Sequence, residues 1–152
     1  MRQGPDSGWE PTVPALVNLV AAAGAPHLRK AFDAAGLDGI RPAQAVVLVP
    51  LAAGGLHASD LADRLRVSRQ AVAQAVAALE RHGYVTRGSD PIDARARIIE
   101  LTPRGRQALR AMRSNALNLE KRWAHVLGRQ RMGELRETLR MLLSSESGVA
   151  DA

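Results

Sequence analysis

The fold of this chain is decided by residues 59–83, which read SDLADRLRVSRQAVAQAVAALERHG. In the second half of this stretch, apolar residues recur at the spacing of one buried helix face, at Val72, Val76 and Leu79. Ser68 stands just before that face, where its hydroxyl can accept a hydrogen bond from a first-turn N–H, and Gly83 follows it as a stop signal. The pattern predicts a helix from about residue 69 to residue 82.

The first half of the stretch predicts a shorter helix with an inward face of its own, formed by Leu61, Ala62 and Leu65. The two helices can share a core across the turn at Arg66 and Val67, which is the arrangement of a helix-turn-helix. The outward face of the second helix carries amides and a guanidinium but no bulky apolar group, at Gln70, Gln74, Ala77 and Arg81. Taken alone, such a face is more often a solvated surface than one that reads DNA.

The composition favours a mainly α-helical protein of one domain. Hydrophobic residues make up 46% of the 152 residues but aromatic residues only 3%, so the core must consist of Ala, Leu and Val, which pack more readily in helices than in sheets. A formal charge of +6 indicates a polyanionic partner, either nucleic acid or an acidic membrane surface, with acidic small substrates as a weaker option.

Two absences narrow the function classes. The chain has no cysteine, which excludes disulfides, thiolate catalysis and sulfur-ligated metals. It also lacks a long apolar run and an apolar stretch near the first residue, so no membrane segment or secretory signal is predicted. We therefore expect a cytoplasmic protein.

Ahead of the helix-turn-helix, the sequence predicts a disordered arm over residues 1–10 and then two helices. The first begins near residue 14, and a kink or break is expected between Ala22 and Pro26, because proline removes a backbone hydrogen bond and clashes with the preceding turn. The second opens at Arg41 and is expected to be largely buried, through Val46, Val47, Leu48, Leu51 and Ala52. Pro50 either ends this helix early or bends it.

The segment after Gly83 changes to two short extended pieces, residues 84–87 and 97–101, which predict a β-hairpin with a long basic tip. Three arginines fall on this hairpin, namely Arg87, Arg95 and Arg97. They can be ordinary exposed charges, but Asp90 and Asp93 are suitably placed to orient them. A narrow DNA minor groove concentrates negative potential and favours an inserted guanidinium.

The remaining chain predicts two helices, residues 103–127 and 131–143, the first of which starts with Thr102 as its N-cap and a proline in its first turn. Apolar residues alternate at spacings of three and four along both, at Leu109, Met112, Ala116, Leu119, Trp123, Val126, Met132, Leu135, Leu139 and Leu142. This is the pattern of a heptad seam, which needs another helix against it. We therefore expect a homodimer held by these helices and the N-terminal one.

Three local matches indicate a resemblance to the winged-helix regulators of the multiple-antibiotic-resistance regulator (MarR) family. They are RPAQ at 41–44, VSRQAV at 67–72 with LERHGYV at 79–85, and DPIDAR at 90–95 running into LTPRG at 101–105. The order of the predicted elements is also similar over most of the chain. The last match, a wing that ends in a Leu-Thr-x-x-Gly helix start, is the most specific.

The resemblance implies that residues 1–152 form a single domain of this family. A winged helix-turn-helix with a two-stranded β-wing would span residues 40–101, and a helical dimerisation region would comprise residues 11–36 and 103–145. In each subunit of the homodimer, a recognition helix would enter the major groove of double-stranded DNA and the wing would reach the flanking minor groove. Many members of the family lose affinity for DNA when a small, often aromatic or phenolic, ligand binds between the two regions.

Carried over by position, the resemblance assigns DNA-facing roles to Ser68, Arg69, Gln70 and Gln74. It also implies that Asp93 braces the wing and that Arg95 is the inserted guanidinium. The residue chemistry agrees, because a glutamine amide can donate to and accept from adenine at once, while an arginine near the helix start can meet phosphate.

Two residues depart from the family pattern. Arg66 stands where the turn often has glycine, which costs about 1 kcal/mol if φ is positive there. His57 replaces the usual Ser or Thr cap of the helix before the turn. Both departures concern local geometry more than function.

The evidence for other kinds of site is weaker. Phe32 and Trp123 are either packing residues or part of a ligand cavity as well. The four histidines, His27, His57, His82 and His125, lack the close pairing of a zinc site, so neither a metal nor another cofactor is predicted. No nucleophile stands beside a base, and no glycine loop could cradle phosphates, so an enzyme is not expected.

The sequence as a whole predicts a sequence-specific, DNA-binding transcriptional regulator. Its form would be a homodimeric repressor released from a pseudo-palindromic operator by a small molecule. The alternative is a winged-helix module that binds DNA architecturally, or binds another protein, without sensing a ligand.

Overall fold

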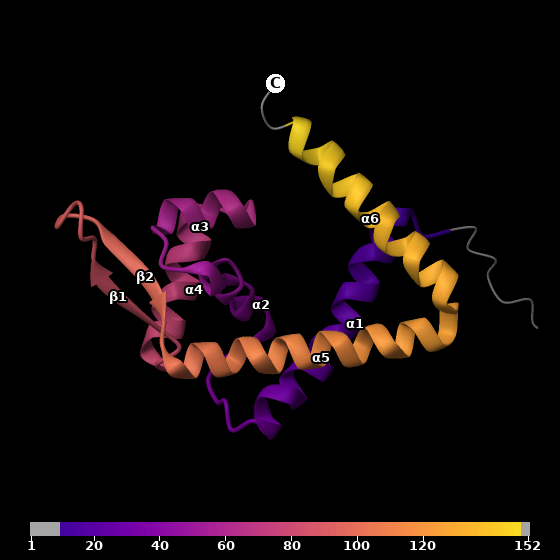
Figure 1. The fold of residues 1–152 in the computed structure, drawn as a ribbon, viewed down its shortest axis with the longest axis horizontal. Helices are drawn as coiled ribbons and strands as arrows, with labels where there is room; N and C mark the ends of the chain where they lie inside the picture. Colours follow the sequence, from indigo (N-terminus) through magenta and orange to yellow (C-terminus); the bar gives the residue numbers. More distant parts are fainter. Residues whose placement is uncertain (1–9, 150–152) are drawn as a thin grey trace, which may run out of the picture. The chain divides into compact units, whose positions relative to one another are not determined.

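The computed structural model describes residues 10–149, so nearly all of the arm expected over residues 1–10 lies outside the described residues. The elements, in chain order, are α1 (Val13–Ala34), α2 (Pro42–Ala45), the 3₁₀ turns η1 (Val46–Leu48) and η2 (Pro50–Ala53), α3 (Ala58–Leu65), α4 (Arg69–Arg81), β1 (Val85–Ser89), β2 (Arg97–Leu101), α5 (Pro103–Leu127) and α6 (Arg129–Val149). Figure 1 shows a mainly helical chain with an antiparallel hairpin, which confirms the predicted fold class. The chain divides into two compact units inside α5, between Ala111 and Met112.

Helix α1 continues through Pro26, so the break considered for the segment from Ala22 to Pro26 does not occur. A proline inside a helix removes one i→i−4 hydrogen bond but leaves the neighbouring bonds in place. Four of the five residues before Pro26 are alanine, which has the highest helix propensity and supports the remaining bonds. The helix is therefore a single element of 22 residues.

Of the two outcomes considered for the helix that opens at Arg41, an early end and a bend, the structure shows an early end, already at Ala45. Helix α2 has only four residues and passes into the tighter turns η1 and η2. Pro50 has no N–H to donate to the Val46 carbonyl, and its ring would crowd the preceding turn of an α-helix. Val47, Leu48 and Leu51 are buried as expected, but Val46 is 47% exposed and Ala52 is also exposed.

The core of the first unit is formed where the helix-turn-helix meets the hairpin. Val72, Val76 and Leu79 are buried along α4, as the spacing predicts, and Leu61 and Ala62 are buried along α3. The strands pair from Val85 opposite Leu101 to Ser89 opposite Arg97. Ahead of α3, the backbone of Leu56 exchanges two hydrogen bonds with Ile99, at 3.1 and 2.9 Å, which ties the approach to α3 to the sheet.

The start of α5 has the predicted N-cap and an unpredicted close approach. Thr102 Oγ1 accepts the Gly105 N–H at 3.0 Å and donates to the Gly83 carbonyl at 2.6 Å. A Cβ at Gly105 would overlap the Tyr84 carbonyl oxygen, so a glycine is required for α5 to lie against the start of the hairpin. This contact explains the glycine of the Leu-Thr-x-x-Gly motif.

The second unit contains the end of α5 and all of α6. Gly128, with φ of 80°, separates the two helices as predicted, and α6 extends beyond the predicted end at residue 143 to Val149. The seam side chains of this unit are half-buried or exposed in the single chain, and Val126 is 82% exposed. None of the helices searched, all within residues 10–149, is long and apolar enough to cross a membrane.

Candidate nucleic-acid interface

Helix α4 is capped at its first turn, ends at a glycine, and packs its apolar face into the core. Ser68 Oγ accepts the Ala71 N–H at 3.1 Å, which is the predicted cap, and Gly83 takes a φ of 75° beyond the last turn. Arg66, in the turn before α4, has a φ of 53°, so the left-handed conformation considered from the sequence is present. The side chains for which the sequence predicts DNA contacts on this helix, Ser68, Arg69, Gln70 and Gln74, are all exposed.

The tip of the wing is organised by two aspartates that accept backbone N–H groups two residues ahead. Asp90 Oδ1 accepts from Ile92 at 2.8 Å, and Asp93 Oδ1 accepts from Arg95 at 3.0 Å. Asp93 therefore holds the backbone of Arg95 rather than its guanidinium. The hydrogen bond from Ile92 is also the main reason that the pKa of Asp90 lies below its ordinary value.

The three wing arginines have different surroundings. The Arg87 guanidinium pairs with Glu80 of α4 at 3.2 Å, and the Arg97 guanidinium donates to Ser89 Oγ at 3.4 Å. Arg95 is exposed at the tip, and within residues 10–149 its guanidinium makes no ion pair. Of the three charges, that of Arg95 is therefore the most available to an external anion.

His57 has a role that sequence reasoning missed. It makes no side-chain cap at α3, in keeping with its departure from the family pattern. Instead, its Nε2 lies 3.0 Å from Asp90 Oδ2 and its Nδ1 lies 3.1 Å from the Arg97 carbonyl oxygen. No local sequence signal points to these contacts, because the partners belong to the hairpin, and Arg97 is 40 positions away.

Tyr84 anchors the loop between α1 and α2 to the hairpin. Its hydroxyl donates to the Asp38 carbonyl at 2.6 Å, and the Arg104 guanidinium lies 4.8 Å from the ring centroid and pairs with the Asp38 carboxylate. Burial raises the pKa of the Tyr84 phenol, which keeps it protonated as a donor. The pKa of Asp38 is lowered, first by its own backbone N–H and then by Arg104. The Gly-Tyr-Val match contained this residue, but its role came only from the fold.

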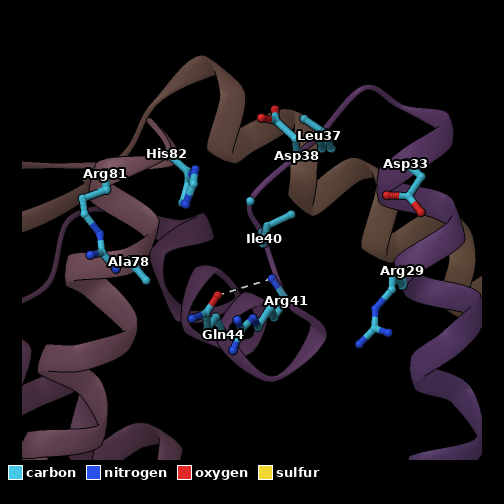
Figure 2. Close-up of a pocket in the computed structure, with 11 residues that line it drawn as sticks. Arg29, Asp33, Leu37, Asp38, Ile40, Arg41, Gln44, Ala78, Arg81 and His82 are labelled. Atoms are coloured by element: carbon cyan, nitrogen blue, oxygen red, sulfur yellow. Dashed lines mark hydrogen bonds between the residues drawn. The ribbon is translucent and has the colours of Figure 1, made fainter.

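A cavity of about 440 Å³ opens between the end of α1, the start of α2 and the end of α4. Figure 2 shows side chains from all three helices around it, several of them charged. The lining residues are Arg29, Asp33, Leu37, Asp38, Gly39, Ile40, Arg41, Gln44, Ala78, Arg81 and His82.

The two residues predicted as possible ligand contacts do not line this cavity. Phe32 is only 1% exposed and packs in the core, while Trp123 lies half-buried in the second unit. Among residues 10–149, no group of His, Cys, Asp and Glu could hold a metal ion.

Comparison with known proteins agrees with this geometry. Residues 38–96, which include α2 to the tip of the wing, match the sequence model of the MarR family. No curated protein gives a significant match to the chain.

Several solved structures that resemble this chain are transcriptional regulators. A MarR transcriptional regulator from Methanosarcina mazei is 20% identical with a TM-score of 0.78, covering 90% of this chain and 97% of that one. Apo MarR from E. coli is 20% identical with a TM-score of 0.69, covering 89% and 99%. The transcriptional repressor CouR, solved bound to a 23-mer DNA duplex, is 25% identical with a TM-score of 0.71, covering 87% and 92%.

The winged-helix geometry agrees with the match of residues 38–96 to the MarR family, and the fold along most of the chain is similar to that of solved MarR transcriptional regulators.

Proposed function

We propose that the protein is a cytoplasmic, homodimeric repressor that binds a pseudo-palindromic operator in double-stranded DNA and is released by a small ligand. The observation that supports this proposal is that one unit contains both an exposed polar helix face and an exposed arginine at the tip of the wing. The exposed face of α4 presents hydrogen-bonding side chains, and the tip of the wing presents Arg95. The related repressor CouR was solved on a DNA duplex, which supports the same use of the fold here.

Base readout falls to α4 in this proposal. Gln70 and Gln74 carry amides that can form bidentate contacts with adenine in the major groove, and Ser68 and Arg69 at the helix start can meet phosphates. Arg95 supplies a charge for the narrower minor groove. Arg87 and Arg97, already engaged with Glu80 and Ser89, add positive potential beside it.

Dimerisation would cover apolar side chains that the single chain leaves exposed. On α1 these are Val13, Leu16, Val17, Leu19 and Val20, and on α5 and α6 they are Leu117, Val126, Leu139, Met141, Leu142 and Leu143. A soluble monomer rarely exposes so much apolar surface. A two-fold dimer would place two copies of α4 in successive major grooves, about 34 to 36 Å apart, and this spacing calls for a pseudo-palindromic operator.

The ligand site would be the cavity between α1, α2 and α4. Its lining carries Arg29, Arg41 and Arg81 against Asp33 and Asp38, with apolar surface from Leu37 and Ile40. This mixture favours an aromatic ligand that carries an anionic group over a neutral phenol, because hydrogen bonds between a guanidinium and a carboxylate are stronger than those between neutral groups. Arg81 belongs to α4, so ligand contact there can act on the recognition helix.

Calorimetry with benzoate and phenol tests this site, since the two ligands differ mainly in charge. We expect benzoate to bind more tightly than phenol and Arg81→Gln to reduce that preference, while Arg113→Gln on the exposed side of α5 leaves it unchanged. Equal binding of both ligands, unaffected by Arg81→Gln, would rule the cavity out.

Selection of binding sites from random duplex DNA tests the DNA-binding function. The wild-type protein should enrich a pseudo-palindromic motif. Gln74→Ala should weaken binding to that motif by roughly 1 to 3 kcal/mol with little change on random DNA, whereas Arg95→Ala should weaken both and reduce the salt dependence by roughly one unit of slope. Gln130→Ala, an exposed amide on α6, is the control.

Two results would contradict the proposal. If no motif emerged, the protein would be an architectural binder rather than an operator-specific repressor. If Gln74→Ala and Arg95→Ala weakened motif and random DNA by equal factors, the division of labour between helix and wing would be wrong.

A further inference from the structure

One large apolar side chain stands among the charged residues at the tip of the wing. Ile92 is 96% exposed, which is the highest value among the exposed large apolar side chains of residues 10–149. Pro91, directly before it, is also exposed, so the tip carries two adjacent apolar side chains. A single exposed apolar side chain is common on protein surfaces, so exposure alone assigns no function to Ile92. Its surroundings distinguish it.

The backbone on either side of Ile92 is held in a defined turn. The Ile92 N–H donates to Asp90 Oδ1 at 2.8 Å, and the Asp90 N–H donates to the Ala96 carbonyl at 3.2 Å. The ring of Pro91 fixes a further backbone angle. A side chain that projects from such a turn loses little conformational entropy when it meets a partner, because its backbone is already ordered.

The same turn presents a cation. Arg95 follows Ile92 by three positions and is exposed, and within residues 10–149 its guanidinium makes no ion pair. Figure 1 shows this connection at the free end of the hairpin formed by β1 and β2. A partner that fits both side chains combines negative charge with apolar surface. The minor groove of DNA has both properties, and proteins that bind it use arginine together with apolar side chains such as isoleucine.

The floor of the minor groove differs between the two kinds of base pair. An A·T pair presents only hydrogen-bond acceptors there, whereas a G·C pair adds the amino group of guanine, which is a donor. An isoleucine side chain cannot accept from that amino group, and a close contact would also remove its water. Because an unpaired buried donor is costly, such a contact favours A·T over G·C pairs.

We propose that Ile92 packs into the minor groove next to Arg95 and gives the wing a preference for A·T over G·C base pairs. The contact rests on the proposed function, because it requires the wing to meet DNA. It differs in kind from the contact of Arg95. Burial of an apolar side chain releases no counterions, so Ile92 adds affinity without changing the salt dependence of binding.

Three alternating duplexes separate readout in the two grooves, namely poly(dA-dT), poly(dG-dC) and poly(dI-dC). Inosine is guanosine without the amino group, so an I·C pair resembles G·C in the major groove and A·T in the minor groove. We expect the wild type to bind poly(dG-dC) roughly three- to ten-fold more weakly than poly(dI-dC). Ile92→Ala should weaken binding to poly(dA-dT) and poly(dI-dC) roughly three- to ten-fold and reduce their advantage over poly(dG-dC) to about two-fold or less.

Two further variants show whether the effect belongs to an apolar contact. Ile92→Ala should keep the wild-type slope of affinity against salt, whereas Arg95→Ala should reduce that slope by roughly one unit. Val49→Ala, which shortens an exposed apolar side chain between η1 and η2, should bind all three duplexes as the wild type does.

The outcomes separate this contact from the proposed function. If Ile92→Ala kept the wild-type affinities while Arg95→Ala weakened binding to all three duplexes, the contact of Ile92 would be refuted and the proposed function would stand. An equal loss by Ile92→Ala on poly(dG-dC) and poly(dI-dC) would refute the base-pair preference. If the wild type bound none of the duplexes, or if Arg95→Ala changed nothing, the role of the wing in the proposed function would fail and the contact of Ile92 with it.

Discussion

Gly105 determines how α5 joins the winged-helix region, and it does so by lacking a side chain. Its N–H donates to Thr102 Oγ1 at 3.0 Å, and an added Cβ would meet the Tyr84 carbonyl and come within 3.1 Å of the Leu101 side chain. Backbone atoms cannot move aside as the end of a flexible side chain can. Gly133, in contrast, lies in α6 with nothing within 4 Å of the position that a Cβ would take.

The two glycines form a matched pair for measuring this packing constraint. Gly105→Ala should destabilise the protein by about 1 to 3 kcal/mol, because overpacking outweighs the gain in helix propensity. Gly133→Ala should stabilise it by about 0.5 to 1 kcal/mol, because only the propensity changes. Urea unfolding of both variants measures the difference. A stabilising Gly105→Ala would show that α5 does not need the close approach.

Among the elements, α1 and α2 show how differently two prolines act. Pro26 follows an alanine-rich stretch in a helix of 22 residues, where the remaining hydrogen bonds maintain the helix past it. Pro50 follows a segment that has only one α-helical turn, and the chain there continues in 3₁₀ geometry. The Val49 N–H bonds to the Val46 carbonyl at 3.2 Å, an i→i−3 bond that replaces the wider α-helical one.

For the molecule as a whole, the proposed homodimer would cover the exposed apolar side chains of α1, α5 and α6. Leu139→Asp should shift the protein strongly toward monomer, because a carboxylate in an apolar helix interface is costly to bury. Sedimentation at low micromolar concentration measures the change. Arg140→Asp, an exposed charge reversal next to it on α6, is the control for a general loss of helix stability.

A wild-type protein that remains monomeric would contradict the dimer, and with it the expected spacing of the half-sites. A dimer equally weakened by Leu139→Asp and Arg140→Asp would show that charge on α6, rather than the apolar seam, controls assembly.

The elements that could be predicted from the sequence are those whose signals are local. The buried face, the Ser68 cap and the Gly83 stop of α4 all lie within 16 residues of chain, 68 to 83, and the structure contains them as predicted. The hairpin and the start of α5 follow from the same short-range rules of turns and caps. These features depend on spacing along the chain, which the sequence displays directly.

The contacts that join these elements could not be predicted from the sequence and became visible in the fold. The Tyr84 hydroxyl meets the Asp38 carbonyl across 46 positions, and the His57 ring meets the Arg97 carbonyl across 40. The charged lining of the cavity likewise comes from the ends of α1 and α4 and from the start of α2. Such contacts depend on the positions of elements in space, and no periodicity along the chain encodes them.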